Sequence, residues 1–526
     1  MTTYDKLGTQ MQGVCTAIAV PQWYLNQNLD FVLQHGRTTA GKSVKEVNLG
    51  DPADGSLWLT GTLGSLTVQA FVPDAPTKMK FILKFTSGTM DYVETGGIAP
   101  KQEQCKIDGL TFGFLVNLSY QDVEDDPTLP QQVRDAVSTL LQYKAGGAFT
   151  IQHLFMELQN AAIDKYDPSV TVWSPDMPPA AIAQFPNYLG SYLALLSQAG
   201  GDSLGYAITV DQSEDSPATF PPTSLRYMTN RYQDGGAGNA QLDCLLYLMM
   251  TDNEDFPKSI QPWWGNLVVP SDKAAGWAGT MAVANRKFVR EFLLSRTAPA
   301  ATEYWRLKNR DGGLDIDYDA AQGTFVPNEM GGHFDSGRQT SRSHQTNSVS
   351  NDDVDYAMQV TVDLQVSPGK NLVVIARKTD FDIHFTHWYG LEGHALTSEY
   401  HCWYSVPVTY VIDIEGAANG AVQVNVQAQT KPKPTNVVSG DPYPQYFVRA
   451  EGSTSTWSAV SDRMDRTITN MVNMAVNEAI PPGLAAAVKD ALNLNPFVFP
   501  GSNQLFLKDS IFDLAGDILF GLQYNS

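Results

Sequence analysis

The strongest constraint on the fold is a run of alternating apolar and polar residues that begins near Asp353. Every second residue from Met358 to Val366 is apolar, and polar residues lie between them. Successive side chains of a β-strand point to opposite faces, so a period of two is the pattern of a half-buried strand. Further apolar runs follow at residues 372–376, 406–412 and 422–428, and turn residues separate the last two. The region therefore predicts an antiparallel meander.

A long amphipathic helix is predicted after this meander, from Ser455 to Ile480. Ser455 is a suitable N-cap, and Pro481-Pro482 ends the pattern. Apolar residues recur between them at helical spacing: Trp457, Val460, Met464, Ile468, Met471, Val472, Ala475 and Ala479. A twisted sheet followed by one such helix predicts a sheet that curls around the helix.

The first part of the chain mixes strand and helix patterns. Strands are predicted at residues 57–64, 66–72, 80–85, 110–120, 206–210 and 242–251, and helices at 23–33, 130–141, 151–163 and 288–293. A chain of 526 residues exceeds one ordinary core. We expect an N-terminal half at 1–300, a connector at 301–352 and a C-terminal half at 353–526. The polar stretch Gly331 to Asp353 is expected to be a mobile loop between the halves.

Charge and composition exclude several classes of protein. The formal net charge is −21, which argues against nucleic acid and against adhesion to anionic membranes. No apolar run reaches the length of a membrane helix, and the N-terminus lacks the pattern of a classical signal peptide. The four cysteines lie far apart, as expected for reduced thiols. We expect a protein that is cytoplasmic or is secreted without a classical signal.

Short segments along most of the chain resemble a known family. They are Thr2–Asp5, Cys105–Leu110, Phe114–Leu118, Leu245–Thr251, Ala282–Phe288, Phe497–Gly501 and Leu505–Asp509. On these segments the chain resembles the tubular lipid-binding (TULIP) superfamily, in particular the 47-kilodalton accessory protein family of clostridial OrfX-type neurotoxin clusters. It departs from that pattern by long inserts, such as Gly331 to Asp353, and by lacking an Asp-Trp pair after Thr2-Thr3-Tyr4.

The resemblance implies an elongated α+β fold, mostly β, with twisted antiparallel sheets wrapped around long amphipathic helices. It also implies an apolar groove that holds acyl chains. Methionine is adaptable and suits variable lipid tails, so the long helix is a candidate wall of that groove. Its candidate ligand-binding residues are Trp457, Val460, Met464, Ile468, Met471, Val472 and Met474. The alternative is that the helix fills the sheet and leaves the groove closed.

A phosphorylated headgroup would need a local basic cluster on this acidic chain. Arg286, Lys287 and Arg290 lie together near the start of a predicted helix. These three residues are the candidates for contact with a headgroup.

A group of histidines is the sharpest candidate for a metal site. His384, His387, His394 and His401 lie within eighteen residues, beside several carboxylates. A zinc site needs three such side chains to converge, but His384 and His387 would point to opposite faces of a strand. The spacing also fits neither HExxH nor a zinc finger. We therefore expect no metal, no cofactor and a structural or interface role.

The sequence predicts a non-enzymatic protein that binds a lipid or another long apolar ligand. No Gly-x-Ser-x-Gly elbow, Walker loop or dinucleotide fingerprint occurs in it. One alternative is a protein-interaction or chaperone-like component of a toxin complex, with a closed groove and with toxin or accessory proteins as partners. Another is a metal-dependent hydrolase built on the histidines.

Overall fold

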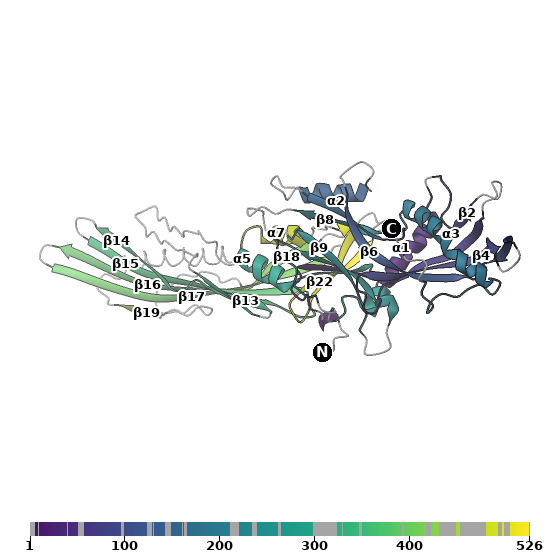
Figure 1. The fold of residues 1–526 in the computed structure, drawn as a ribbon. Helices are drawn as coiled ribbons and strands as arrows, with labels where there is room; N and C mark the ends of the chain where they lie inside the picture. The colour runs from purple at the N-terminus through teal and green to yellow at the C-terminus, as the bar shows by residue number, and fades with distance from the viewer. Residues whose placement is uncertain are drawn as a thin grey trace.

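The structure is a computed structural model of the chain. It describes residues 6–8, 10–38, 40–50, 57–95, 99–123, 129, 131–141, 149–159, 161, 166–210, 220–233, 239–260, 263, 265–297, 323–328, 330–346, 350–391, 394–416, 422–430, 449–452, 480–492, 497–498 and 505–524. Three antiparallel sheets and a few helices make up these residues, so the fold is α+β and mostly β. The molecule is elongated, and the sheets follow one another along its length (Figure 1).

A six-stranded sheet in the middle of the molecule joins the two ends of the chain. Its strands, in order across the sheet, are β21 (Leu505–Phe512), β22 (Ile518–Tyr524), β11 (Gly279–Val283), β1 (Thr16–Pro21), β10 (Cys244–Met250) and β9 (Ser224–Asn230). In β1 and β10 every residue is buried. Ile18 and Tyr247 pack into the main core on one face, while Ala17 and Leu248 pack into a second cluster on the other. A sheet covered on both faces produces a continuous apolar run instead of alternation.

The N-terminal sheet has eight strands and is covered by helices. Its strands are β2 (Glu46–Leu49), β3 (Leu59–Gln69), β4 (Lys78–Glu94), β5 (Lys101–Lys106), β6 (Thr111–Val123), β7 (Phe149–Met156), β8 (Ser203–Val210) and β20 (Phe497–Val498). Helix α1 (Gln22–His35) packs against β3, and α3 (Pro179–Gln198) packs against β4. Helix α2 (Gln131–Leu141) lies at β8 and β20. Buried phenylalanines such as Phe81, Phe112 and Phe185 fill the space between sheet and helices.

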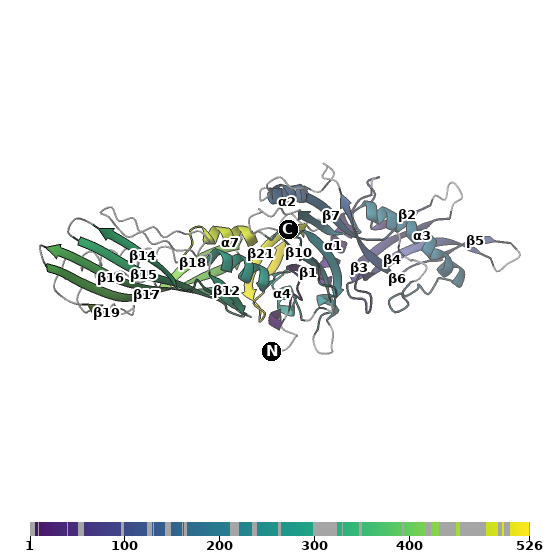
Figure 2. The same cartoon turned by 60° about the vertical axis from the view of Figure 1, so that its left-hand side comes forward.

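The C-terminal sheet also has eight strands and forms an arm. Its strands are β12 (Thr324–Asn328), β13 (Gly331–Asp335), β14 (Gln339–Thr346), β15 (Ser350–Val366), β16 (Leu372–Leu391), β17 (His394–Gly416), β18 (Val422–Thr430) and β19 (Arg449–Gly452). Both views show the outer parts of β14 to β17 projecting away from the other two sheets (Figures 1 and 2). Helix α7 (Leu484–Leu492) packs against β18, nearer the middle of the molecule.

Short helical segments complete the described chain. They are η1 (Lys6–Gly8), η2 (Ala240–Leu242), α4 (Pro270–Ala274), the π-helix η3 (Arg286–Leu293) and α5 (Leu294–Thr297). Within the described residues, no helix combines the length and the apolar character that crossing a membrane requires. Cys15, Cys105 and Cys244 are free and buried, which confirms the predicted thiols at these three positions.

Most of the predicted elements are confirmed. The alternating runs lie in β15, β16, β17 and β18, and the predicted helix at residues 23–33 lies in α1. The predicted strands at 57–64 and 66–72 are one strand, β3, which remains continuous through irregular pairing between Thr62 and Ser65.

The predicted helix at 151–163 is wrong, because residues 149–156 form β7. Ile151 packs against α2 in a small hydrophobic cluster that is separate from the main core, whereas Leu154 and Met156 face the main core. The spacing of three between Ile151 and Leu154 therefore reflects a change of face within a strand, and it imitates a helical stripe.

The predicted mobile loop at Gly331–Asp353 is also wrong. This stretch contains β13, β14 and the start of β15. Exposed ion pairs join β14 to β15, with Arg342 beside Asp355 at 3.4 Å and His344 beside Asp353. Polar side chains of this kind give a strand no apolar alternation by which to recognise it. The proposed boundaries at 300 and 352 stay a prediction.

Candidate ligand-binding face

One face of the C-terminal sheet is mainly apolar along the inner parts of three long strands. Cross-strand pairing places Val362 opposite Arg377, and Arg377 opposite Val408. Residues two apart on each strand share this face, and burial follows the same parity. Its buried apolar residues are Tyr356, Met358, Val360, Val362, Leu364 and Val366 of β15, Val373, Ile375 and Phe381 of β16, and Val406, Val408, Tyr410, Ile412 and Ile414 of β17.

The pairing of the three strands continues outward along the arm (Figure 2). Tyr356 lies opposite Ile383, which in turn lies opposite Cys402. Toward the tip, Phe385 lies opposite Tyr400.

Three polar residues interrupt the apolar face near its middle. Arg377 and Thr379 of β16 and Tyr410 of β17 are 3%, 1% and 0% exposed. The hydroxyl oxygens of Thr379 and Tyr410 have no hydrogen-bond partner among the described residues. Burial raises the pKa of Tyr410, and the positive charge of Arg377 opposes that rise, so the two side chains lie within electrostatic reach. This group was not predicted from the sequence, although Arg377 has the same parity as Val373 and Ile375.

The predicted headgroup residues lie on η3, and carboxylates surround two of them, Arg286 and Lys287. The Lys287 Nζ atom lies 2.9 Å from Asp252 Oδ2 and 2.6 Å from Glu291 Oε2, and it also contacts Glu254. Arg286 Nη1 lies 2.6 Å from Glu254 Oε2. Burial lowers the pKa of Lys287, hydrogen bonds to the three carboxylates raise it, and the net shift is upward.

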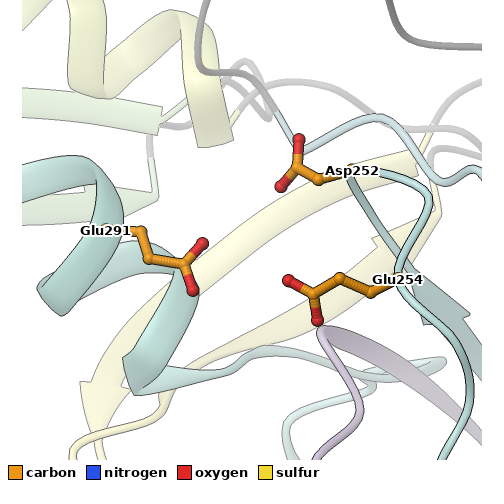
Figure 3. Close-up of side chains that lie close together, drawn as sticks. All are labelled: Asp252, Glu254 and Glu291. Carbon is orange, nitrogen blue, oxygen red and sulfur yellow. The ribbon is translucent and has the colours of Figure 1, made fainter. Parts of the chain in front are cut away.

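The three carboxylates of this cluster could in principle hold a metal ion. Asp252, Glu254 and Glu291 turn their oxygens toward a common space (Figure 3), and these oxygens lie within 4.8 Å of one another. The ammonium group of Lys287 contacts all three, so it already supplies the cation. Because the carboxylates outnumber Lys287 and Arg286, these two cations provide no excess positive charge for a phosphate. Headgroup contact by Arg286, Lys287 and Arg290 stays a prediction.

The four predicted histidines lie on the hairpin of β16 and β17. The register puts His384 directly opposite His401, whereas His387 lies opposite Ser398 and His394 opposite Leu391. The pairing of His384 with His401 was not predicted from the sequence. The absence of a metal at these histidines stays a prediction.

The predicted groove residues on the long helix cannot be placed. Trp457, Val460, Met464, Ile468, Met471, Val472 and Met474 lie outside the described residues, as does all but the last residue of the predicted helix 455–480. Their part in a groove stays a prediction.

A pair of buried carboxylic acids occupies the turn between β21 and β22. Asp513 Oδ1 accepts hydrogen bonds from the backbone N–H groups of Ala515 and Asp517, at 2.8 and 2.9 Å. Asp517 Oδ1 accepts one from the backbone N–H of Asn285, at 2.7 Å. Burial raises the pKa of Asp513 to about 8, with a further contribution from Asp517, and burial raises the pKa of Asp517 to about 6.

This turn holds several distant segments together. The backbone N–H of Leu514 donates to the carbonyl of Leu7 at 3.0 Å, and the N–H of Gly369 donates to the carbonyl of Phe512 at 2.7 Å. With the bond from Asn285, the turn between β21 and β22 touches the N-terminal segment, η3 and the turn between β15 and β16.

The described chain is therefore an elongated, mostly β protein of three antiparallel sheets, one of which carries an apolar face along an arm. It is similar to the solved structure of P47 from Clostridium botulinum A2, with 9% identity, 100% of both chains covered and a TM-score of 0.47. It is also similar to the solved structure of P47 from Clostridium botulinum E1, with 9% identity, 98% of this chain and 100% of that chain covered, and a TM-score of 0.45. A lipopolysaccharide binding protein is similar at 9% identity over 97% of this chain and 99% of that one, with a TM-score of 0.34.

These structures represent the group of proteins that the sequence segments resemble. No protein-family model matches the chain, and no curated protein sequence matches it. Similarities of this size carry no conclusion about function.

Proposed function

We propose that the chain binds a lipid, or another ligand with a long apolar chain, on the apolar face of β15, β16 and β17, without catalysing a reaction. The observation that carries the proposal is the extent of this face. On β15 its buried apolar residues run from Tyr356 to Val366, which spans roughly 35 Å at the rise of an antiparallel strand.

An apolar face of this length requires a cover. Among the described helices, none makes more than marginal contact with β15 or β16. The arm also projects away from the other two sheets in both views (Figures 1 and 2). The apolar residues of this face are no more than 4% exposed, so a ligand would lie between the sheet and the chain that packs against it, and a long apolar ligand matches the length of the face.

Extraction with organic solvent followed by mass spectrometry tests the proposal directly. We expect the purified full-length chain to carry about one apolar ligand per molecule. After delipidation, affinity for acyl chains of about 12 to 18 carbons with one headgroup should rise about fourfold per methylene, because each buried CH₂ contributes about 0.8 kcal/mol. Ionic strength should have little effect, since screening acts mainly on exposed charges.

A matched pair of variants locates the ligand on the sheet. Val360→Phe adds volume to the apolar face and should weaken binding of the longest chains, whereas Thr361→Phe adds the same ring to the opposite face and should not. Absence of ligand together with indifference to chain length would refute the proposal. It would favour the protein-binding alternative, in which the groove is closed and toxin or accessory proteins are the partners.

A further inference from the structure

The turn between β21 and β22 lies where the central sheet meets the arm. β21 belongs to the central sheet, yet its last residue, Phe512, forms two backbone hydrogen bonds with the turn between β15 and β16. Its N–H donates to the carbonyl of Lys370 at 2.8 Å, and its carbonyl accepts from the N–H of Gly369 at 2.7 Å. The hydroxyl group of Ser510 donates to the carbonyl of Ile414 in β17. The arm is therefore fastened to the central sheet at the start of this turn.

The turn itself fits tightly between two other segments. Gly516 has a φ of +78°, and a Cβ atom added there would lie 2.1 Å from Asn285 Nδ2 and 3.3 Å from Val366 Cγ2. The Asn285 Nδ2 atom also donates to the carbonyl of Ala515 at 2.8 Å. The turn therefore cannot change its shape without losing contacts to the start of η3 and to the end of β15.

Two buried carboxyl groups lie inside this turn. Asp513 is 1% exposed and Asp517 is 5% exposed. The Asp513 Oδ2 atom has no hydrogen-bond partner among the described residues, so nothing in that part of the chain replaces the water that a carboxylate would lose at this oxygen. Burial raises the pKa of Asp513 to about 8, with a further contribution from Asp517. Asp513 is therefore neutral at pH 7 while the turn keeps this shape.

The charged groups on the neighbouring elements leave the pKa of Asp513 raised. Arg290 of η3 lowers the pKa of the second acid in the turn, and the first two cations of η3 pair with the carboxylates described above. The N-terminal segment brings Lys6, whose Nζ atom lies 3.0 Å from Asp272 Oδ2. The turn between β15 and β16 brings Lys370, which is exposed. With all of these groups in place, the pKa of Asp513 is still about 8.

We propose that this turn is a proton-controlled joint, which is closed while Asp513 keeps its proton and opens when that proton is lost. The ionised group regains water only if the turn moves. Because the turn is bonded to Gly369 and, through the N–H of Leu514, to the carbonyl of Leu7, its movement releases both the arm and the N-terminal segment. Val366, at the inner end of the apolar face, then loses a neighbour, so opening of the joint exposes that end of the face.

The direction of the response follows from the two forms of the joint. In the open form Asp513 has the ordinary pKa of an aspartic acid, about 4, whereas in the closed form its pKa is raised to about 8. The closed form therefore holds one more proton between these two values. Each pH unit in this window favours opening about tenfold. The joint is firmest below about pH 4 and weakest above about pH 8.

Hydrogen exchange measured by mass spectrometry on the full-length chain tests the proposal. Peptides that contain Gly369 and Leu514 report on the joint from its two sides, and peptides from β10 report on global unfolding. After correction for the chemical exchange rate, we expect protection in both joint peptides to fall about tenfold per pH unit from pH 6 to pH 8. At every pH both joint peptides should exchange faster than β10, because the joint opens without unfolding the central sheet.

Two substitutions separate the effect of the proton from the effect of packing. Asp513→Asn keeps the Oδ1 acceptor and cannot ionise, so the pH dependence should disappear in both joint peptides. Gly516→Ala places a methyl group against Asn285 and should open the joint already at pH 6. The control Gly109→Ala, with a similar φ of +70° and no atom within 4 Å of the added Cβ, should leave the joint closed.

Three results would overturn the inference. They are protection of the wild-type joint peptides that does not change with pH, the same pH dependence in Asp513→Asn, and exchange of the joint peptides no faster than that of β10. The wild-type series decides the question even if Asp513→Asn fails to fold.

Discussion

Replacing Asp513 by Asn should make the chain more stable at alkaline pH. The Asp513 side chain is 1% exposed, and its Oδ2 atom has no hydrogen-bond partner among the described residues. Its pKa is raised from 3.8 to about 8, first by burial and then by Asp517. In the native state it therefore keeps its proton up to about pH 8, whereas the unfolded chain releases that proton near pH 4.

The sign of the pH dependence follows from the protons bound in each state. Between about pH 4 and pH 8 the native state holds one more proton at Asp513 than the unfolded state. Raising the pH across this window thus lowers the free energy of unfolding, by about 1.4 kcal/mol per pH unit. From pH 6 to pH 8 the loss due to Asp513 amounts to about 2–3 kcal/mol. Asp517, with a pKa of about 6, acts mainly below this range.

The groups that contact Asp513 and Asp517 determine what the Asp513→Asn substitution changes. Backbone N–H groups of Asn285 and Met11 donate to the Asp517 carboxylate, and Arg290 lowers its pKa. Asn keeps the Oδ1 acceptor that binds the N–H groups of Ala515 and Asp517, and it cannot ionise. The substitution therefore removes the titration at Asp513 and preserves these two hydrogen bonds.

Urea denaturation at pH 6, 7 and 8 measures the effect. The wild-type chain should lose about 2–3 kcal/mol more than Asp513→Asn over this range. Asp509→Asn, on the exposed part of β21, is the matched control and should follow the wild-type curve. Parallel curves for the wild-type chain and Asp513→Asn would falsify the assignment of a raised pKa to this group.

Two further substitutions test the packing described above. Lys287→Met should lower the free energy of unfolding by about 2–3 kcal/mol, because it leaves Asp252, Glu254 and Glu291 facing one another. The control Lys273→Met, on the surface, should change it by less than about 0.5 kcal/mol. Equal urea midpoints for the two variants would contradict this prediction. Phe112→Ala should cost about 3–5 kcal/mol, since its ring contacts Phe114, Tyr166, Trp173 and Phe185. The exposed Phe31→Ala is its control, and a similar loss in thermal midpoint for both would show that the core is placed wrongly.

The sequence predicts those strands whose two faces have different surroundings. β15 has one buried face and one polar face, so its alternation is visible without a structure. β14 carries exposed charged residues such as Arg342 and His344, which leave no such pattern. In β7 the apolar side chains change face between Ile151 and Leu154, and the resulting spacing imitates a helix.

The pairing of strands and the candidate site depend on contacts between distant residues. No local pattern indicates that β22 lies beside β11, since either strand could pair with any other apolar strand. The sequence does contain the signal for Arg377, because the parity of β16 places it on the buried face. It was missed because a charged residue interrupts the apolar run on which the strand was recognised. The carboxylates around Lys287 come from residues 252, 254 and 291, and only the fold brings them together.

The position of β22 in the central sheet has a consequence for how the chain is made. β11 ends at Val283 and pairs with a strand that ends at Tyr524. At a synthesis rate of about 5–20 residues per second, roughly 10–50 s separate the appearance of the two strands. Throughout that interval one edge of β11 lacks its native neighbour, and an unpaired apolar edge is a template for association with other chains. Ribosomes that stop early would therefore release products prone to aggregation, and cells that produce this protein would benefit from a chaperone that shields this edge until the last strands emerge.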